Sequence, residues 1–186
     1  MARFIKYCCL FLLPVLACCI AISLRPLDKR FAFRFVEGEC AGHAKWIYDR
    51  LYENNAPIDI AFIGSSVGWG VFDDKTLSHL LADSLSEPVT VANISFCRPG
   101  MNIRTLLVEE VIRTKKPRHI VLELRSEPNM GGHPSFGFMA EMESILVSPT
   151  LLYQGYIGDI KNAIVVRWEQ VREQLNPQSD YAPDMQ

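Results

Sequence analysis

The sequence predicts an α/β protein with a parallel sheet, and three observations lead to this fold class. Three short runs of apolar and β-branched residues are separated by longer segments in which apolar residues recur at helical spacing. Each run is followed by a stretch rich in glycine, serine or proline. Such an alternation produces right-handed crossovers and therefore parallel strands. A chain of 186 residues has room for one domain of this kind and one further apolar helix.

An uncharged apolar segment, residues 7–24, lies near the start of the chain. A helix of this length spans roughly 27 Å, close to the hydrocarbon thickness of a bilayer. It has no polar stripe, which a helix on a soluble core would have. We therefore expect residues 1–24 to be an uncleaved transmembrane anchor. The alternatives are a cleaved signal peptide and, because residues 15–18 (VLAC) resemble a lipobox, a lipoprotein signal.

The first strand follows two segments of different character. Residues 25–41 are charged and aromatic, and we expect a connector there. Residues 42–54 carry apolar side chains at helical spacing, and an Asn-Asn-Ala-Pro run ends this helix. Residues 58–63 are apolar and β-branched, which predicts a strand buried on both faces. Residues 64–72, which begin with a glycine, are expected to form a loop.

Two more units of helix and strand follow. A pair of aspartates can cap a helix whose apolar residues extend to Leu85, and residues 88–94 predict the second strand. Residues 101–114 predict a helix that a Lys-Lys-Pro run closes, and residues 119–124 predict the third strand. Three parallel strands make a thin sheet, which leaves room for the domain to be incomplete.

The pattern changes after the third strand. Residues 125–137 are rich in glycine and proline and predict a loop, and residues 141–147 predict a short helix. Residues 159–175 predict a longer amphipathic helix. The domain therefore covers residues 42–175, and residues 176–186 are a polar tail. We expect a small flavodoxin-like domain of three layers.

The composition argues against several classes of binding site. The net charge is −2, and there is no basic stripe, zinc-finger spacing or RNA-binding motif, so no nucleic-acid partner is expected. Four of the six cysteines lie in the anchor, and only Cys40 and Cys97 belong to the domain. Two cysteines do not fix the redox compartment, and a disulfide between them stays open. Cys40 and His43 have a metal-like spacing without a second pair of ligands, so we expect no metal and no cofactor.

The sequence GSSVGWG at residues 64–70 carries the main functional pattern. Ligands of parallel sheets bind at the C-terminal ends of the strands, which places this loop with residues 95–100 and 125–133 on one rim. Gly-x-Ser-x-Gly fits a nucleophile elbow, but in that fold the serine follows a late central strand, with the acid and the histidine after it, whereas here it follows the first strand and little chain remains. Gly-x-x-x-Gly-x-Gly fits a dinucleotide-binding turn, but no acidic residue ends the second strand. Small residues that only fill a tight turn are a further alternative.

The third interpretation rests on three segments, IDIAFIGSSVGWGVFD, VANISFCRPGMN and HIVLELRSEPNMGGHP. Over roughly residues 58–135 they resemble the SGNH (GDSL-like) superfamily. The similarity is greatest to membrane-anchored bacterial members with GSS in place of GDS, such as the teichoic-acid D-alanine transfer protein. The resemblance implies a hydrolase or acyltransferase that uses a serine nucleophile.

Four residues match the catalytic positions that the resemblance implies. Ser66 matches the nucleophile, and Gly100 matches the glycine whose backbone N–H helps form the oxyanion hole. Asn129 is a displaced match for the asparagine of the third block, and His133 is the nearby histidine that can replace the family's C-terminal base. Acyl transfer independently requires a hydroxyl on a rigid turn and N–H donors about 3 Å from the developing oxyanion. We expect Ser66 to face the rim and Ser65 to turn back toward the sheet.

The expected function is a membrane-anchored serine acyl-esterase or O-acyltransferase that acts on a small acyl ester or envelope glycan. The sequence departs from the family because no Asp-x-x-His block follows His133. A serine without a base is a poor nucleophile at neutral pH. The alternative is therefore a truncated or degenerate SGNH-like protein that binds or scaffolds without catalysis.

The expected location is the bacterial cytoplasmic membrane, with a single span and the domain facing outward. The bilayer is then a partner of the protein. The outward orientation follows from the resemblance to envelope-modifying proteins. The count of lysine and arginine residues on either side of the span favours the opposite orientation, although large domains can cross regardless of that count.

Overall fold

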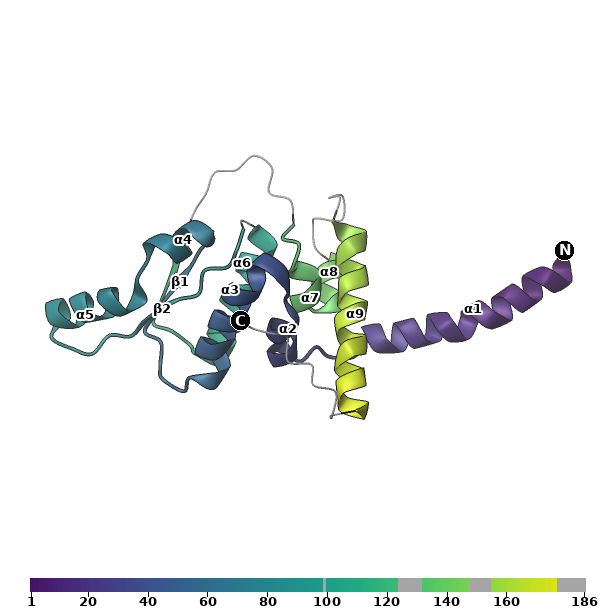
Figure 1. Ribbon diagram of the computed structural model, residues 1–186, viewed down its shortest axis with the longest axis horizontal. Coiled ribbons are helices and arrows are strands. Elements are labelled where there is room, and N and C mark those ends of the chain that lie inside the picture. The colour runs from purple at the N-terminus through teal and green to yellow at the C-terminus, as the bar shows by residue number, and fades with distance from the viewer. Residues whose placement is uncertain (99, 124–131, 148–154, 177–186) are drawn as a thin grey trace.

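The computed structural model describes residues 1–98, 100–123, 132–147 and 155–176 as a mixed α/β structure with a small sheet among many helices (Figure 1). The strands are β1 (Ile60–Ile63), β2 (Val91–Asn93) and β3 (His119–Leu122). The helices are α1 (Ala2–Ser23), α2 (Lys29–Phe35), α3 (Ala41–Tyr48), α4 (Ser66–Val71), α5 (Asp74–Leu85), α6 (Met101–Thr114), α7 (Phe136–Met139), α8 (Met142–Val147) and α9 (Tyr156–Leu175). A 3₁₀ turn, η1 (Gly38–Cys40), precedes α3, and a π-helical segment, η2 (Asp49–Glu53), extends it.

The three strands are parallel and lie in the order β2-β1-β3, so the prediction of a parallel sheet is confirmed. Each strand is shorter than the apolar run that predicted it. At the start of the β1–β2 pair, the Asp59 carboxylate accepts a hydrogen bond from the Thr90 N–H at 2.9 Å. Backbone hydrogen bonds join the same two segments, and the regular pairing of β1 with β2 begins with Ile60 opposite Val91.

The two faces of the sheet are covered differently. Ala61 and Ile63 of β1 are buried in the main core, together with residues of α3 and α6. Phe62 points to the other face, where its ring stacks on Phe72 with centroids 4.4 Å apart. Phe72 lies between α4 and α5, which therefore stand on the side of the sheet opposite to α3 and α6. The C-terminal ends of the strands form one edge, called the rim below.

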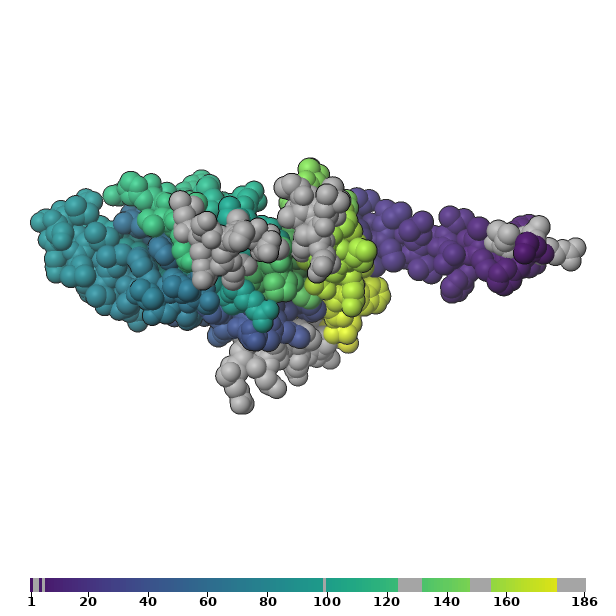
Figure 2. Space-filling model, turned by 90° about the horizontal axis from the view of Figure 1, so that it is seen from above, coloured from purple at the N-terminus to yellow at the C-terminus, as the bar shows by residue number. Residues whose placement is uncertain are grey.

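Helix α1 projects away from the rest of the chain (Figures 1 and 2). Among the described residues, only this helix contains a window, Lys6–Ser23, long and apolar enough to cross a membrane, and none of that window is buried. By length and composition it is either a membrane span or a signal sequence. Pro14 lies inside the helix.

The segment expected to be a connector, residues 25–41, instead contributes to the core. Asp28 caps α2 by accepting from the Arg30 N–H at 2.9 Å. Phe33, Val36 and Cys40 are buried in the main core. The sequence does not show this because α2 is too short for its apolar residues to establish a helical period.

The loop expected at residues 64–72 is another correction, since it contains α4. The Ser65 hydroxyl caps this helix by accepting from the Val67 N–H. Two glycines in a helix of six residues weaken its intrinsic propensity, so pattern alone does not reveal it. The Ser65 cap and the packing of Gly68 against the sheet stabilise the helix despite this low propensity.

The C-terminal helices pack on α2 and brace the exit from α1. Helices α8 and α9 confirm the helices expected at 141–147 and 159–175, with α9 starting earlier, at Tyr156. The loop expected at 125–137 is interrupted by α7, which begins at Phe136. Arg167 of α9 lies at the centre of this part of the structure, where it donates to the carbonyl oxygen of Arg25 at 3.0 Å. This group of elements, α2 and α7–α9, is called the stem below.

Candidate functional site

Ser65 is fully buried at the point where β1 leads into α4. Its hydroxyl donates to the Glu123 carboxylate, with distances of 2.9 and 3.0 Å to the two oxygens. The Ser65 N–H donates to the same carboxylate at 2.7 Å. Glu123 follows β3, so these bonds join the ends of two neighbouring strands. Ser65 thus turns back toward the sheet, as expected, and holds the turn.

Ser66 is exposed and occupies the first position of α4. Its hydroxyl has no hydrogen-bond partner among the residues that the structure describes. Val67 and Val71 on the same helix are also exposed, at 52% and 82%. A serine at the tip of the central strand is thereby presented to solvent beside apolar side chains.

Asn93 and Gly68 fix the position of α4 against the sheet. The Asn93 side-chain amide donates to the carbonyl oxygens of Gly68 at 3.1 Å and Phe72 at 2.9 Å. A Cβ on Gly68 would lie 2.6 Å from the Phe62 ring and 2.9 Å from the Ser95 hydroxyl. Only glycine allows this approach, whereas Gly70 faces open space. Of the glycines in the motif that follow Ser66, Gly68 is the one that the packing requires.

Gly100 begins α6, and its surroundings explain why it is glycine. A Cβ there would lie 2.8 Å from the Cβ of His133 and 3.2 Å from the Asn102 side-chain oxygen. The Asn102 oxygen also accepts from the His133 N–H at 3.0 Å. Gly100 and His133 are therefore neighbours, as the shared rim predicted. Asn129 lies outside the described residues.

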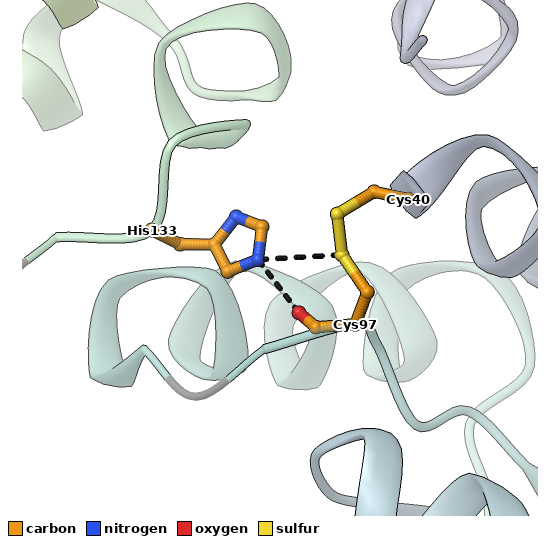
Figure 3. Close-up of side chains that lie close together, drawn as sticks. All are labelled: Cys40, Cys97 and His133. Atoms are coloured by element: carbon orange, nitrogen blue, oxygen red, sulfur yellow. Dashed lines mark hydrogen bonds between the residues drawn. A yellow bond between two sulfur atoms is a disulfide. The ribbon is translucent and has the colours of Figure 1, made fainter. Parts of the chain in front are cut away.

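His133 is fully buried beside Cys97 (Figure 3), and both of its ring nitrogens are occupied. Nε2 lies 2.6 Å from the Cys97 carbonyl oxygen, so this nitrogen carries the proton and donates. Nδ1 accepts from the Ser135 N–H at 3.0 Å. Burial lowers the pKa of this imidazole to about 4, so the ring is neutral at pH 7. Neither nitrogen is free to take a proton from Ser66.

Cys40 and Cys97 form a disulfide beside His133 (Figure 3). The two sulfur atoms and the His133 ring nitrogen lie within 4.8 Å of one another, a spacing that a metal ion could bridge. The donors do not fit one, because both sulfurs are in the disulfide and Nε2 carries a proton. The cluster is structural: it joins the start of α3 to the segment that leads into α6.

Comparisons with protein-family models, curated proteins and solved structures find no match to this chain. The site therefore has to be judged on its own geometry. That geometry places Ser66 just after the C-terminal end of β1 and Gly100 at the start of α6, after β2, and it removes His133 as a base.

His43 is the residue near the rim that sequence reasoning missed. Its ring lies against Trp69 of α4, with centroids 4.2 Å apart, and Nδ1 lies 3.4 Å from the Ser95 carbonyl oxygen. Partial burial lowers the pKa of His43 below the usual value of 6.5. The sequence shows His43 only as part of a spacing with Cys40, because its contacts span 26 and 52 residues and no local pattern reports them.

Proposed function

We propose that this chain is an SGNH-like serine acyl-ester hydrolase or O-acyltransferase that acts on material of the bacterial cell envelope. Helix α1 anchors it in the cytoplasmic membrane, and the domain faces outward. The observation that carries the proposal is the pair of adjacent serines at the tip of β1. Buried Ser65 fixes the turn, and exposed Ser66 offers its hydroxyl at the rim.

The strand order supports a flavodoxin-like architecture for the domain. The order β2-β1-β3 is that of the first three strands of a doubly wound sheet with the order 2-1-3-4-5. In such sheets the chain reverses direction between β1 and β3, and ligands bind in the crevice at the C-terminal ends of these strands. Gly64 and Glu123 directly follow β1 and β3, and Ser66 begins α4 two residues after Gly64.

The disulfide supports the outward orientation. Disulfides persist in oxidising compartments outside the cytoplasm and are rare inside it. Cys40 and Cys97 are both buried and paired, which agrees with a domain on the outer side of the membrane. The positive charges that follow α1 oppose this orientation, but large domains translocate largely regardless of such charges.

The exposed side chains beside Ser66 suit an acyl substrate. Val67 follows the serine on α4, Val71 ends that helix, and both are exposed. Apolar surface next to a reactive hydroxyl favours a substrate that carries a hydrocarbon or acetyl group over a fully polar one. A small acyl ester or an acylated glycan of the envelope has this chemistry.

A second candidate is a non-catalytic binding or scaffold protein of the same fold. The state of His133 favours it, because both ring nitrogens already bond to the backbone. In that case the Ser66 hydroxyl contacts a ligand without becoming a nucleophile.

A fluorophosphonate probe on the full chain in detergent separates the two candidates. An active serine enzyme is labelled at Ser66, and Ser66→Ala abolishes the label. Ser84→Ala is the matched control, because Ser84 is an exposed helical serine on α5. Absence of labelling in the folded wild type, judged by circular dichroism, contradicts the enzyme and supports the binding protein.

The orientation has its own test. A cysteine introduced at exposed Ser86 is offered a membrane-impermeant thiol reagent in intact cells. Labelling before lysis is expected for an outward domain. Labelling that requires lysis, with a known periplasmic thiol labelled in the same cells, would place the domain in the cytoplasm.

A further inference from the structure

The chain has four histidines, and the structure describes all of them. His119 opens β3 and His79 borders a hollow beside the N-terminal ends of β1 and β2, so both lie at the end of the sheet away from the rim. His133 lies at the rim, but its two ring nitrogens bond to the backbone. His43 alone combines a place at the rim with a ring nitrogen that no described residue occupies.

The backbone fixes which nitrogen of His43 is free. A carbonyl oxygen only accepts hydrogen bonds, so the Nδ1 atom that faces the Ser95 carbonyl carries the proton. Nε2 then holds a lone pair and can accept one. A histidine oriented through Nδ1–H, with a free Nε2, has the tautomer that a general base requires.

Two neighbouring rings hold the His43 side chain near α4. The ring lies 4.2 Å from Trp69 and 6.4 Å from Phe96, measured between centroids. Trp69 also contacts Trp46 of the same helix as His43, at 4.9 Å between centroids. Ser66 precedes Trp69 by three positions on α4, and residues at this spacing lie on the same side of a helix, about 5–6 Å apart.

We propose that His43 is the general base for Ser66, which rests on the proposed acyl-transfer function. As the Ser66 oxygen attacks the acyl carbonyl carbon, its proton passes to Nε2 of His43, directly or through one water. Nε2–H then protonates the leaving-group oxygen as the carbon–oxygen bond of the ester breaks. A water or acceptor hydroxyl then attacks the acyl group on Ser66 and gives its proton to Nε2. The same proton passes from Nε2 to the Ser66 oxygen as the acyl–serine bond breaks, which restores the free serine and the neutral His43.

The partial burial of His43 suits this role. Because the pKa of the ring is lowered from 6.5, the neutral form prevails at pH 7. Activity should therefore rise as the pH increases through a value below 6.5 and stay level above it. A base at His133, whose pKa is about 4, would give a much lower midpoint.

The test compares the rate of fluorophosphonate labelling at Ser66 with the titration of His43 measured by NMR, on the full chain in detergent. We expect the labelling rate of the wild type to follow the His43 titration, and His43→Gln to slow labelling at least tenfold. His79→Gln is the control and should label at the wild-type rate. Trp69→Ala, which removes the ring beside His43, should slow labelling and shift the His43 titration toward 6.5.

The outcomes distinguish this inference from the function on which it rests. Wild-type labelling at Ser66 that is equally fast in His43→Gln overturns the role of His43 and leaves the serine enzyme intact. The role of His43 is also overturned if the pH midpoint of labelling in the wild type differs from the midpoint of the His43 titration. This comparison uses only the wild type, so it holds even where His43→Gln fails to fold. Absence of labelling in the folded wild type overturns both.

Discussion

Two buried arginines, Arg104 at the rim and Arg167 in the stem, are surrounded in different ways. Arg167, which is 1% exposed, has an acceptor for each nitrogen of its guanidinium: the carbonyl oxygens of Arg25, Ala140 and Ala163 and the carboxylate of Glu141. Arg104 is 6% exposed and donates from Nη1 to the Glu123 carbonyl oxygen at 2.9 Å. Its Nε and Nη2 have no partner among the described residues.

The difference extends to the neighbours of each arginine. The other buried side-chain atoms without a partner among the described residues are the Ser95 hydroxyl and the Asn102 amide nitrogen, and both lie at the rim. Native proteins leave few buried polar groups unpaired, and the exceptions concentrate at functional sites. The stem is therefore optimised for stability, whereas the rim keeps polar groups that stability alone does not require.

The largest effect is expected from removing the hydrogen bonds of the stem. Arg167→Met leaves three carbonyl oxygens without their side-chain donor, while Glu141 keeps its ion pair with Lys29, and the free energy of unfolding should fall by about 3 kcal/mol. Urea unfolding followed by circular dichroism measures the change. Arg172→Ala, an exposed arginine on the same helix, is the control and should cost less than about 1 kcal/mol. Equal losses for both variants would show that the hydrogen bonds of buried Arg167 add nothing to stability.

The second prediction concerns the pH dependence of stability through His133. The unfolded chain binds the proton near pH 6.5, and the folded chain only near its pKa of about 4. The unfolded state is therefore favoured as the pH falls from 6.5 to 4, with a loss of up to about 3 kcal/mol. His133→Gln lacks this titration, so its stability should change less over the same window. Parallel curves for the two proteins would contradict the buried neutral histidine.

The third prediction tests the contact that places α4. Gly68→Ala brings a methyl group against the Phe62 ring and the Ser95 hydroxyl and should cost about 1–3 kcal/mol. Gly70→Ala meets no atom within 4 Å and should be neutral or stabilise the helix by up to about 1 kcal/mol. Thermal unfolding of both variants measures the contrast. If both glycines tolerate alanine equally, the approach of α4 to the sheet is looser than described.

The smallest effect is expected at the rim arginine. Arg104→Met removes one hydrogen bond but also two unpaired nitrogens, so the free energy of unfolding should change by less than about 1 kcal/mol. Urea unfolding beside Arg167→Met gives the comparison directly, because the two substitutions are identical. A loss at Arg104 as large as that at Arg167 would show that the rim arginine is structural too.

The sequence predicts the regular part of the fold well, because local signals mark it. Helix α6 coincides with the expected range of 101–114, where a glycine precedes the helix and a Lys-Lys-Pro run follows it. Asp73 caps α5 as expected. Helix α2 was missed because seven residues are too few to establish a period, and α4 because its stability comes from Ser65, Gly68 and the sheet.

The candidate site was predictable only in part, for a similar reason. The place of Ser66 follows from one strand and one turn, which the local sequence specifies. The partners of the histidines do not, because the bond between His133 and Cys97 spans 36 residues and the contact between His43 and Ser95 spans 52. A histidine's role depends on which nitrogen is free, and only the folded backbone decides that.

The Cys40–Cys97 disulfide also has a consequence for how the protein is made. The other four cysteines lie in α1, so once that helix is in a bilayer the rest of this chain can form only one pairing. Oxidation of residues 25–186 therefore cannot form a wrong bond within that segment. The bond closes across 57 residues and removes about 4 kcal/mol of chain entropy from the unfolded state. Cys97 follows β2 in the chain, so this stabilisation is gained only after all of β2 has been synthesised.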